Sequence, residues 1–425
     1  MRFAATRMGI DEVWQQVKKG VNSIREFDAA LTEMKLVTQA NDETMKEFSK
    51  DAQALAHDLA QTNVAIVQSA TEWRRLGYEM DESLDLAKSS ATLSTAGFMD
   101  AQVATEGLTS ALQAFSHEYD DASDYATDIV DKYIKVGNDY AVTAEDLATG
   151  LTKSSAAMVA AGNDLDQIIA LTTAGNTILQ DADVVSNALK VVSMRLRGTT
   201  ASELEDAGED TEGLIEDASK LYATIKDLTK TKMNPEGVSI LTDTGAYKST
   251  YQILLDIAEI WKELGDMSGG DMKQAALLET MAGKMRANAV AAILQNPDLL
   301  KEVYETSLNS EGAGVAALES SLDSINAKVT QFQNSINTIW QNAINSDFLK
   351  FLMDVVNGFA GLVEDVGALP TLMTAAFTVM GVKAGNKNMG GDKCFLPLRC
   401  PSKTGGNTER AYARVLASMC FLIFA

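Results

Sequence analysis

The sequence predicts an all-α fold, an elongated multi-helix or coiled-coil arrangement with at most one small β-hairpin near residues 238–248. Three observations support this prediction. Ala and straight-chain residues are abundant, and they lose little conformational entropy in a helix. With 5 prolines and 6% aromatic residues, the composition is poor for several globular cores in 425 residues. Apolar residues recur every three or four positions, as at Leu147, Leu151 and Met158, so most of the chain is expected to form amphipathic helices.

Residues 1–70 are predicted to form amphipathic helices, because Val13, Val17, Val21 and Ile24 are spaced three or four apart. The opening residues, MRFAATRMGIDEVW, lack an apolar stretch followed by a small-residue cleavage site, so we expect no signal peptide.

Residues 71–198 are predicted to be a helical core, since this stretch contains no proline and is broken only at glycines. We expect helix ends with a residue at positive φ at Gly137-Asn138 and at Gly162-Asn163. The pair Thr143 and Asp146 has the spacing of a capping box and predicts a helix start just before Leu147. The core is therefore expected to contain several helices rather than one rod.

Residues 199–310 are predicted to be helical after an acidic, water-facing linker at 199–220. The hairpin is expected near 238–248, where Val238 and Ile240 alternate with a polar residue. Gly283-Lys284 lacks the other residues of a phosphate-binding loop and is interpreted as a helix interruption.

Residues 311–382 are predicted to contain a heptad helix followed by a hydrophobic segment. Nine apolar residues alternate spacings of three and four, and we interpret them as a helix-packing or self-association seam. They are Val315, Leu318, Leu322, Ile325, Val329, Phe332, Ile336, Ile339 and Ala343. Few charges flank the seam, so the sequence leaves open whether it closes on another helix of this chain or on a second copy.

Residues 367–382 carry no charged side chain but are fewer than the roughly 20 apolar residues of a membrane span. This favours a buried or interface-seeking helix. Residues 383–425 form an atypical basic tail that holds Cys394, Cys400 and Cys420. Helical periodicity fades there, so we expect either a disordered terminus or one added by an interrupted reading frame.

The net charge of −23 is distributed over many predicted helix faces and disfavours specific nucleic-acid binding. His57 and His117 are far apart and lie in no metal-ligand spacing, so both are expected on helix surfaces. No nucleophile elbow or dinucleotide-binding glycine pattern occurs. We therefore predict no catalytic, cofactor-binding or metal-binding residues and no enzymatic activity.

Several phrases of the sequence resemble the core region of phage tail tape measure proteins. They occur in a consistent order and include TEWRRLGYEMDESLDLA, DYAVTAEDLATGLTKSSAAMVAAGNDLDQIIALTTAG, NALKVVSMRLRG, KSTYQILLDIAEIWKEL and ETMAGKMRANAVAAILQN. The resemblance implies a structural protein that lies in the lumen of a growing tail and sets its length. Its implied partners are tail-tube subunits and tail assembly chaperones, and further copies of itself. It would be assembled in the host cytoplasm, reside in the virion tail, and be released during DNA ejection, with host membrane contact through 367–382.

Members of the family that this chain resembles are usually much longer, which suggests a truncated or prophage copy. Two alternative functions remain open at the level of sequence. One is a helical membrane-active or pore-forming protein that inserts residues 348–382. The other is a helical adaptor that self-associates through the heptad seam.

Overall fold

The computed structural model describes residues 22–117 and 119–343, and these residues confirm the all-α prediction. Phe27–Asn334 form one compact unit. The second unit consists of Met1–Glu26 and Ser335–Ala425, of which only 22–26 and 335–343 are described. The predicted hydrophobic segment 367–382 and the tail 383–425 therefore lie outside the described residues. The five-part division of the chain remains a prediction.

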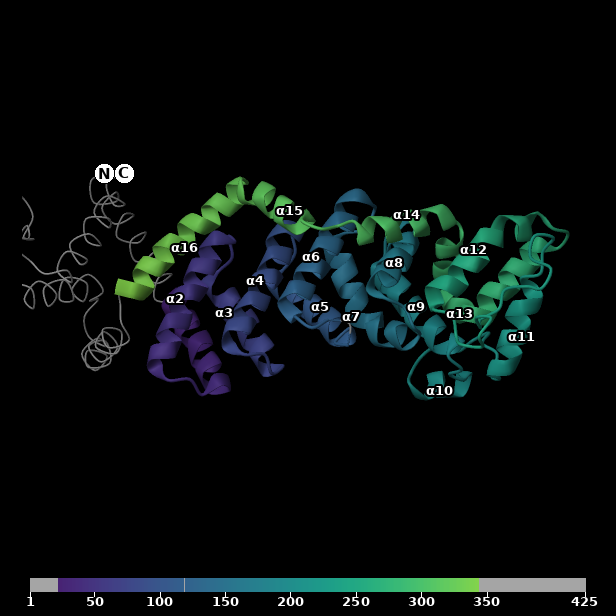
Figure 1. Cartoon of the computed structure of the whole chain (residues 1–425), viewed down its shortest axis with the longest axis horizontal. Coiled ribbons are helices and arrows are strands. Elements are labelled where there is room, and N and C mark those ends of the chain that lie inside the picture. The colour runs from purple at the N-terminus through teal and green to yellow at the C-terminus, as the bar shows by residue number, and fades with distance from the viewer. Residues whose placement is uncertain (1–21, 118, 344–425) are drawn as a thin grey trace, which may run out of the picture. The chain divides into compact units, whose positions relative to one another are not determined.

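The compact unit begins with a helix that continues to residue 38 and is followed by four helical hairpins in succession (Figure 1). The first helices of the hairpins are α2 (Asp42–Asp58), α4 (Met80–Gly97), α6 (Ala122–Asp139) and α8 (Leu165–Leu179). The second helices are α3 (Asn63–Arg75), α5 (Ala101–Ala114), α7 (Ala144–Ala160) and α9 (Ala182–Leu196). Corresponding helices begin 38 to 43 residues apart, so residues 42–196 form an array of α-hairpin repeats.

Polar side chains fix where these helices begin. The predicted capping box is confirmed: Asp146 donates its backbone N–H to Thr143 Oγ1, and the Thr143 N–H donates to the Asp146 carboxylate, both at 3.0 Å. Asp100, Asp121, Asp164 and Asp181 accept from backbone N–H groups at the starts of their own helices. Most helix starts in the array are therefore set by local sequence.

The two predicted glycine breaks have different outcomes. Gly162 has φ +75° and follows the last turn of α7, as predicted. The prediction for Gly137-Asn138 is wrong, because α6 continues through both residues to Asp139. A Cβ at Gly137 would lie 2.9 Å from the Ala144 backbone nitrogen, so this glycine permits a close approach of α7 instead of ending a helix.

Consecutive hairpins pack through their second helices, with α3 against α5, α5 against α7, and α7 against α9, and also through α3 with α4 and α4 with α6. Glycines allow short distances between these helices. A Cβ added at Gly107 of α5 would lie 2.5 Å from the Ala148 Cβ of α7, and one at Gly150 of α7 would lie 2.5 Å from the Ser186 Oγ of α9. Large side chains fill the remaining interior, including the fully buried Trp73, Phe115 and Tyr133.

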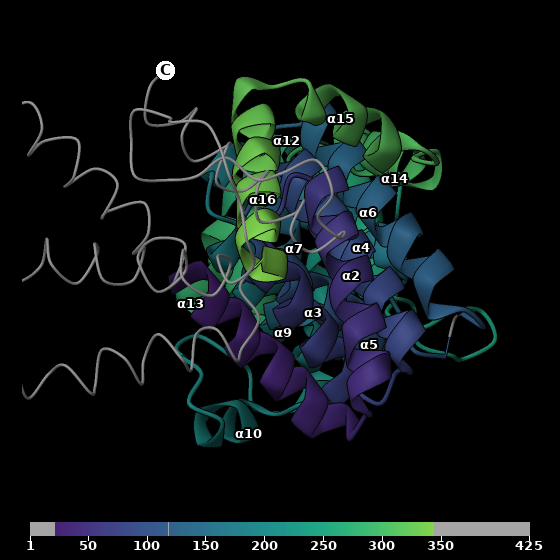
Figure 2. The same cartoon turned by 90° about the vertical axis from the view of Figure 1, so that its left-hand side faces the viewer.

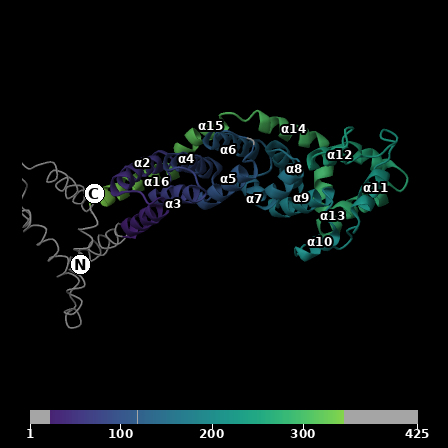
Figure 3. The same ribbon diagram turned by 60° about the horizontal axis from the view of Figure 1, so that its bottom comes forward.

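Four helices follow the array, and the last three of them pack beside its last hairpin (Figure 3). They are α10 (Ala201–Asp206), α11 (Ala218–Leu228), α12 (Thr250–Asp266) and α13 (Gly270–Leu294). Gly283 has φ +73° inside α13, which confirms the predicted helix interruption. The segment expected to form a hairpin contains one isolated antiparallel bridge between Leu241 and Tyr247, with Gly245 at φ +82° in the turn.

The acidic linker faces water as predicted at all of its carboxylates except one. Glu209 lies in it with its side chain only 13% exposed, and its carboxylate pairs with Lys190 of α9 at 2.7 Å and with Arg286 of α13. The linker is therefore fastened to the helices on both sides of it. Sequence composition missed this because Lys190 and Arg286 are distant in the chain.

The chain then reverses direction and passes back along the array (Figures 1 and 2). Helix α14 (Pro297–Leu308) packs on α8 and α6, and α15 (Ala313–Leu322) packs on α6 and α4. Helix α16 (Ile325–Ala343) follows after a short break. The first-helix side of the array is therefore covered in part by a later segment of the same chain.

Candidate interaction surface

The predicted heptad seam is divided between two helices. The chain leaves helical structure at Asp323 and Ser324, and the Ser324 Oγ accepts the Ala327 N–H at 3.1 Å, as an N-terminal cap of α16 does. The seam therefore does not lie on a single continuous helix. A Ser followed by a new apolar period was the local signal for this break, and the regular heptad spacing concealed it.

Several seam residues face solvent in the compact unit. The exposed fractions are 55% for Val315, 82% for Ile325, 48% for Val329 and 61% for Phe332, while Leu318 and Leu322 are partly buried. Ile336 is half-buried, and the side chains of Ile339 and Ala343 lie outside the described set. We call Ile325, Val329 and Phe332, which are spaced four and three apart on α16, the apolar stripe.

The opposite face of this segment packs on the array, and it is made of small or polar residues. Between residues 313 and 334 the buried positions are Gly314, Ser321, Ala327 and Asn334. Helix α14 differs, because it buries Leu300 and Val303 completely. Residues 313–334 therefore turn Val315, Ile325, Val329 and Phe332 outward, while Leu318 packs only partly buried against the core.

Asp131 of α6 holds the start of α15. Asp131 is only 5% exposed. Its two carboxylate oxygens accept hydrogen bonds from the backbone N–H groups of Gly312 and Gly314, each at 2.7 Å. Gly312, the residue before α15, has no side chain to cap the helix and adopts φ +80°. Asp131 thus supplies from another helix the acceptor and negative charge that a helix N-terminus favours.

Lys132, the next residue of α6, holds the end of α14. Its buried ammonium donates to Asp166 of α8 at 2.8 Å and to the Ser307 carbonyl at 3.4 Å. The Ser307 hydroxyl also donates to Asp166. A cation close to the last carbonyls of a helix is favourable, so Lys132 complements the C-terminus of α14 as Asp131 complements the N-terminus of α15.

Asp131 and Lys132 lie in a site with little access to solvent. Burial raises the pKa of Asp128, which lies 3.5 Å from the Lys132 ammonium, and the charge of Lys132 opposes that rise. Tyr140 and Thr306 add a hydroxyl hydrogen bond of 2.9 Å between α6 and α14. Removing Lys132 would leave the mostly buried Asp166 carboxylate without its counter-charge.

A third contact between this segment and the array is made by Asn334 of α16. Asn334 is 2% exposed. Its side-chain amide donates hydrogen bonds to the Ala56 carbonyl at 3.2 Å and to the Gln61 carbonyl. Both carbonyls lie around the turn between α2 and α3. Sequence reasoning missed all three contacts, although Asp131 and Lys132 gave a signal: they are charged residues inside the apolar run Ile129, Val130, Tyr133, Ile134.

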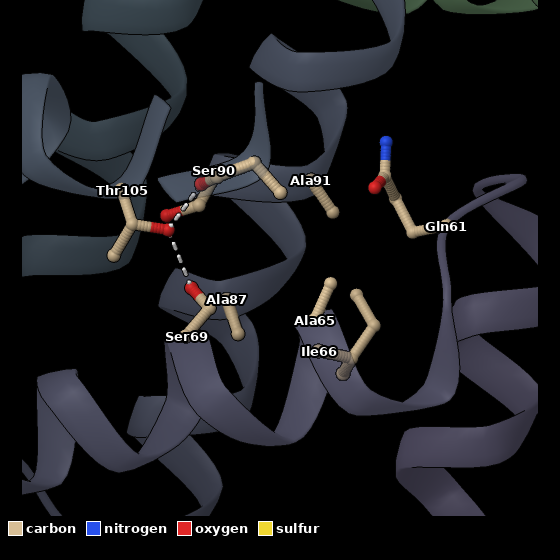
Figure 4. Close-up of a pocket in the computed structure, with 9 residues that line it drawn as sticks. Gln61, Ala65, Ile66, Ser69, Ala87, Ser90, Ala91 and Thr105 are labelled. Carbon is tan, nitrogen blue, oxygen red and sulfur yellow. Dashed lines mark hydrogen bonds between the residues drawn. The ribbon is translucent and has the colours of Figure 1, made fainter. Parts of the chain in front are cut away.

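The array interior offers little room for a ligand. A cavity of about 10 Å³, near the space of a single water, lies among α3, α4 and α5 (Figure 4). Its polar lining includes Ser69 and Thr105, whose hydroxyls hydrogen bond to each other at 2.9 Å. These groups satisfy one another, as buried hydroxyls do in an ordinary helix interface.

The described residues contain no group of three His, Cys, Asp or Glu arranged to hold a metal ion. His57 and His117 are both exposed, as predicted. Within the same part of the chain, no helix has the length and apolar character that crossing a bilayer requires.

The fold defines an all-helical protein built from repeated hairpins. Residues 42–283, which include the whole hairpin array, match the family described as phage-related minor tail protein. The chain belongs to that family, and its role is accordingly structural, in a phage tail and in contact with other tail components. No solved structure matches the chain.

Proposed function

We propose that this chain is a tape measure protein, which templates polymerisation of the tail tube and sets the length of the tail. The observation that carries the proposal is the match of residues 42–283 to a minor tail protein family, in a region built of repeated helices. Tail-tube subunits and tail assembly chaperones are its proposed partners. It would reside in the tail lumen of the virion and leave ahead of the DNA.

A protein that sets tail length needs an extended length proportional to its number of residues. A fully helical chain rises 1.5 Å per residue, so 425 residues would extend on the order of 640 Å. The hairpin array is shorter than that because its helices fold back on each other. The proposed function therefore requires the hairpins to open when the tube forms around the chain.

Tail length measured by electron microscopy tests this proposal. Deleting residues 122–164, one complete repeat from the start of α6 to the start of α8, should shorten the tail by about 65 Å if the chain is helical in the tube. The control replaces the same residues with a second copy of residues 80–121, which keeps the chain almost equally long. Tails of unchanged length that still contain the deleted protein would contradict the ruler function.

A second candidate function, self-association, is favoured by the apolar stripe. The occupant we propose for the stripe is a second copy of the chain. Residues 313–343 contain only Glu319, Asp323 and Lys328 as charged side chains, whereas the whole chain carries −23. Two copies would repel each other little at this surface. Its flanking Asn and Gln amides can both donate and accept, as a surface that pairs with itself requires.

Sedimentation of the full-length chain over a range of concentrations tests this second proposal. The wild type should associate, and Ile325→Asp with Phe332→Asp should remain monomeric because a charge would be buried in the contact. The control is Glu319→Gln, an exposed change beside the stripe. A wild-type chain that stays monomeric would instead assign the stripe to another segment of the same chain or to a different tail component. The membrane-active alternative rests on residues 348–382, which lie outside the described part of the chain.

A further inference from the structure

We propose that residues 309–334 form a releasable strap that holds three consecutive hairpins of the array together, latched by Asp131 and Asn334. The inference concerns the closed state of the array and goes beyond the tape measure function. It rests on which hairpins the segment bridges, on what its docking face is made of, and on how its ends are held.

The strap contacts three successive hairpins, which also pack directly on one another. Helix α15 contacts both α4 and α6, which are the first helices of the second and third hairpins. Asn334 bonds to the carbonyls of Ala56 and Gln61 in the first hairpin. While these contacts persist, the three hairpins cannot separate along their first-helix side.

Releasing the strap from the array exposes little apolar surface to water. Its fully buried positions are Gly314, Ser321, Ala327 and Asn334, and Ala313, Ala317 and Leu318 pack only partly buried against the core, so the strap has no fully buried large apolar side chain. The preceding helix α14 is anchored by the fully buried Leu300 and Val303 and by the Lys132 cluster. The boundary between anchored and releasable segments lies at residues 309–312, where Gly312 adopts φ +80° and has open space around its Cα.

Polar contacts therefore supply much of the specificity of the latch. The Asp131 carboxylate accepts two backbone N–H groups in a water-poor site, where charge-assisted hydrogen bonds are strong. The fit around it is tight: a Cβ at Gly314 would lie 2.8 Å from Asp131 Oδ1 and 3.0 Å from Val130 Cγ1. A small change on either side of this contact should release α15.

Hydrogen exchange of the full-length chain tests the strap. Asp131→Ala should raise amide exchange in residues 313–334 about 10-fold or more and leave residues 250–266 of α12, which the strap does not contact, unchanged. The matched control is Asp181→Ala, which removes a carboxylate from the N-terminus of α9, outside the strap. It should leave residues 313–334 unchanged.

The variant Gly314→Ala distinguishes the docking of α15 on the array from the intrinsic stability of the α15 helix. Alanine favours helix formation within α15, yet its Cβ would press against Asp131 and Val130. Faster exchange of residues 313–334 in this variant supports a strap released from its dock. The proposal is overturned if exchange there slows or stays the same, or if Asp131→Ala raises exchange equally in the strap and in residues 250–266.

Discussion

Asp131 and Lys132 are neighbours in sequence, carry opposite charges, and stabilise opposite ends of two successive helices. The N-terminus of α15 presents unpaired N–H groups to the carboxylate, and the C-terminus of α14 presents a carbonyl to the ammonium. Two adjacent residues of one helix thereby fix the bend between two others. A buried charge pair of this kind specifies position, because each charge is costly unless its partner is in place.

Glu209 gives a residue-scale prediction with a defined pH dependence. Burial alone would raise the pKa of Glu209, but hydrogen bonding and charge from Lys190 and Arg286 outweigh it and hold the pKa below its usual value. A carboxylate with a lowered folded pKa contributes stability above its unfolded pKa, near 4.3, and loses it as the pH falls through the folded value. Glu209→Gln should therefore lower the free energy of unfolding at neutral pH by about 3 kcal/mol, since it leaves Arg286 buried without its counter-charge.

Urea denaturation across a pH series measures this effect. The difference between Glu209→Gln and wild type should shrink as the pH falls below about 4.3. Glu212→Gln is the matched control, because its pair with Lys284 is 66% and 54% exposed and should matter little. A difference that stays constant into strong acid would show that the carboxylate charge is not the cause.

At the scale of elements, the distance between paired helices is set by small residues. Gly107 of α5 faces Ala148 of α7 so closely that a methyl group at Gly107 would overlap the Ala148 Cβ and approach its Cα to 3.1 Å. A similar contact joins Gly175 of α8 to Val185 of α9, at 2.6 Å. Helices at such separations exclude larger side chains from the line of contact.

Gly107→Ala should accordingly destabilise the chain by about 1–3 kcal/mol, despite the better helix propensity of alanine. Ala148→Gly should restore part of the loss when the two changes are combined, because it removes the overlapping methyl group. A double-mutant cycle from denaturation curves measures this coupling. Additive effects of the two substitutions would mean that the helices move apart freely and that the close contact is unimportant.

At the scale of the whole molecule, charge opposes compactness. The net charge of −23 produces self-repulsion, which dissolved salt screens. Raising sodium chloride from about 0.01 M to about 0.15 M shortens the Debye length from roughly 30 Å to roughly 8 Å. The free energy of unfolding in urea should therefore increase over this range. A decrease would indicate that ion pairs such as Lys301 with Glu259 outweigh the repulsion.

The sequence by itself determined the helical class and much of the local detail. Helical period, the Thr143 and Asp146 capping box, and the breaks at Gly162 and Gly283 depend on residues within about one turn of each other, so they are visible in the chain. Local patterns gave a wrong prediction at Gly137, because this glycine allows the close approach of α7. They also missed the burial of Glu209, because its partners are distant in the chain.

Only the tertiary structure decided how the helices are combined. The hairpin repeat was hidden because it is a repeat of lengths and contacts more than of residues, and the heptad pattern gave no sign that its segment docks by the opposite face. Asp131 and Gly312 meet across 181 positions of sequence. A periodic pattern states which side of a helix is apolar, but the partner of each side follows from long-range packing, which no local pattern encodes.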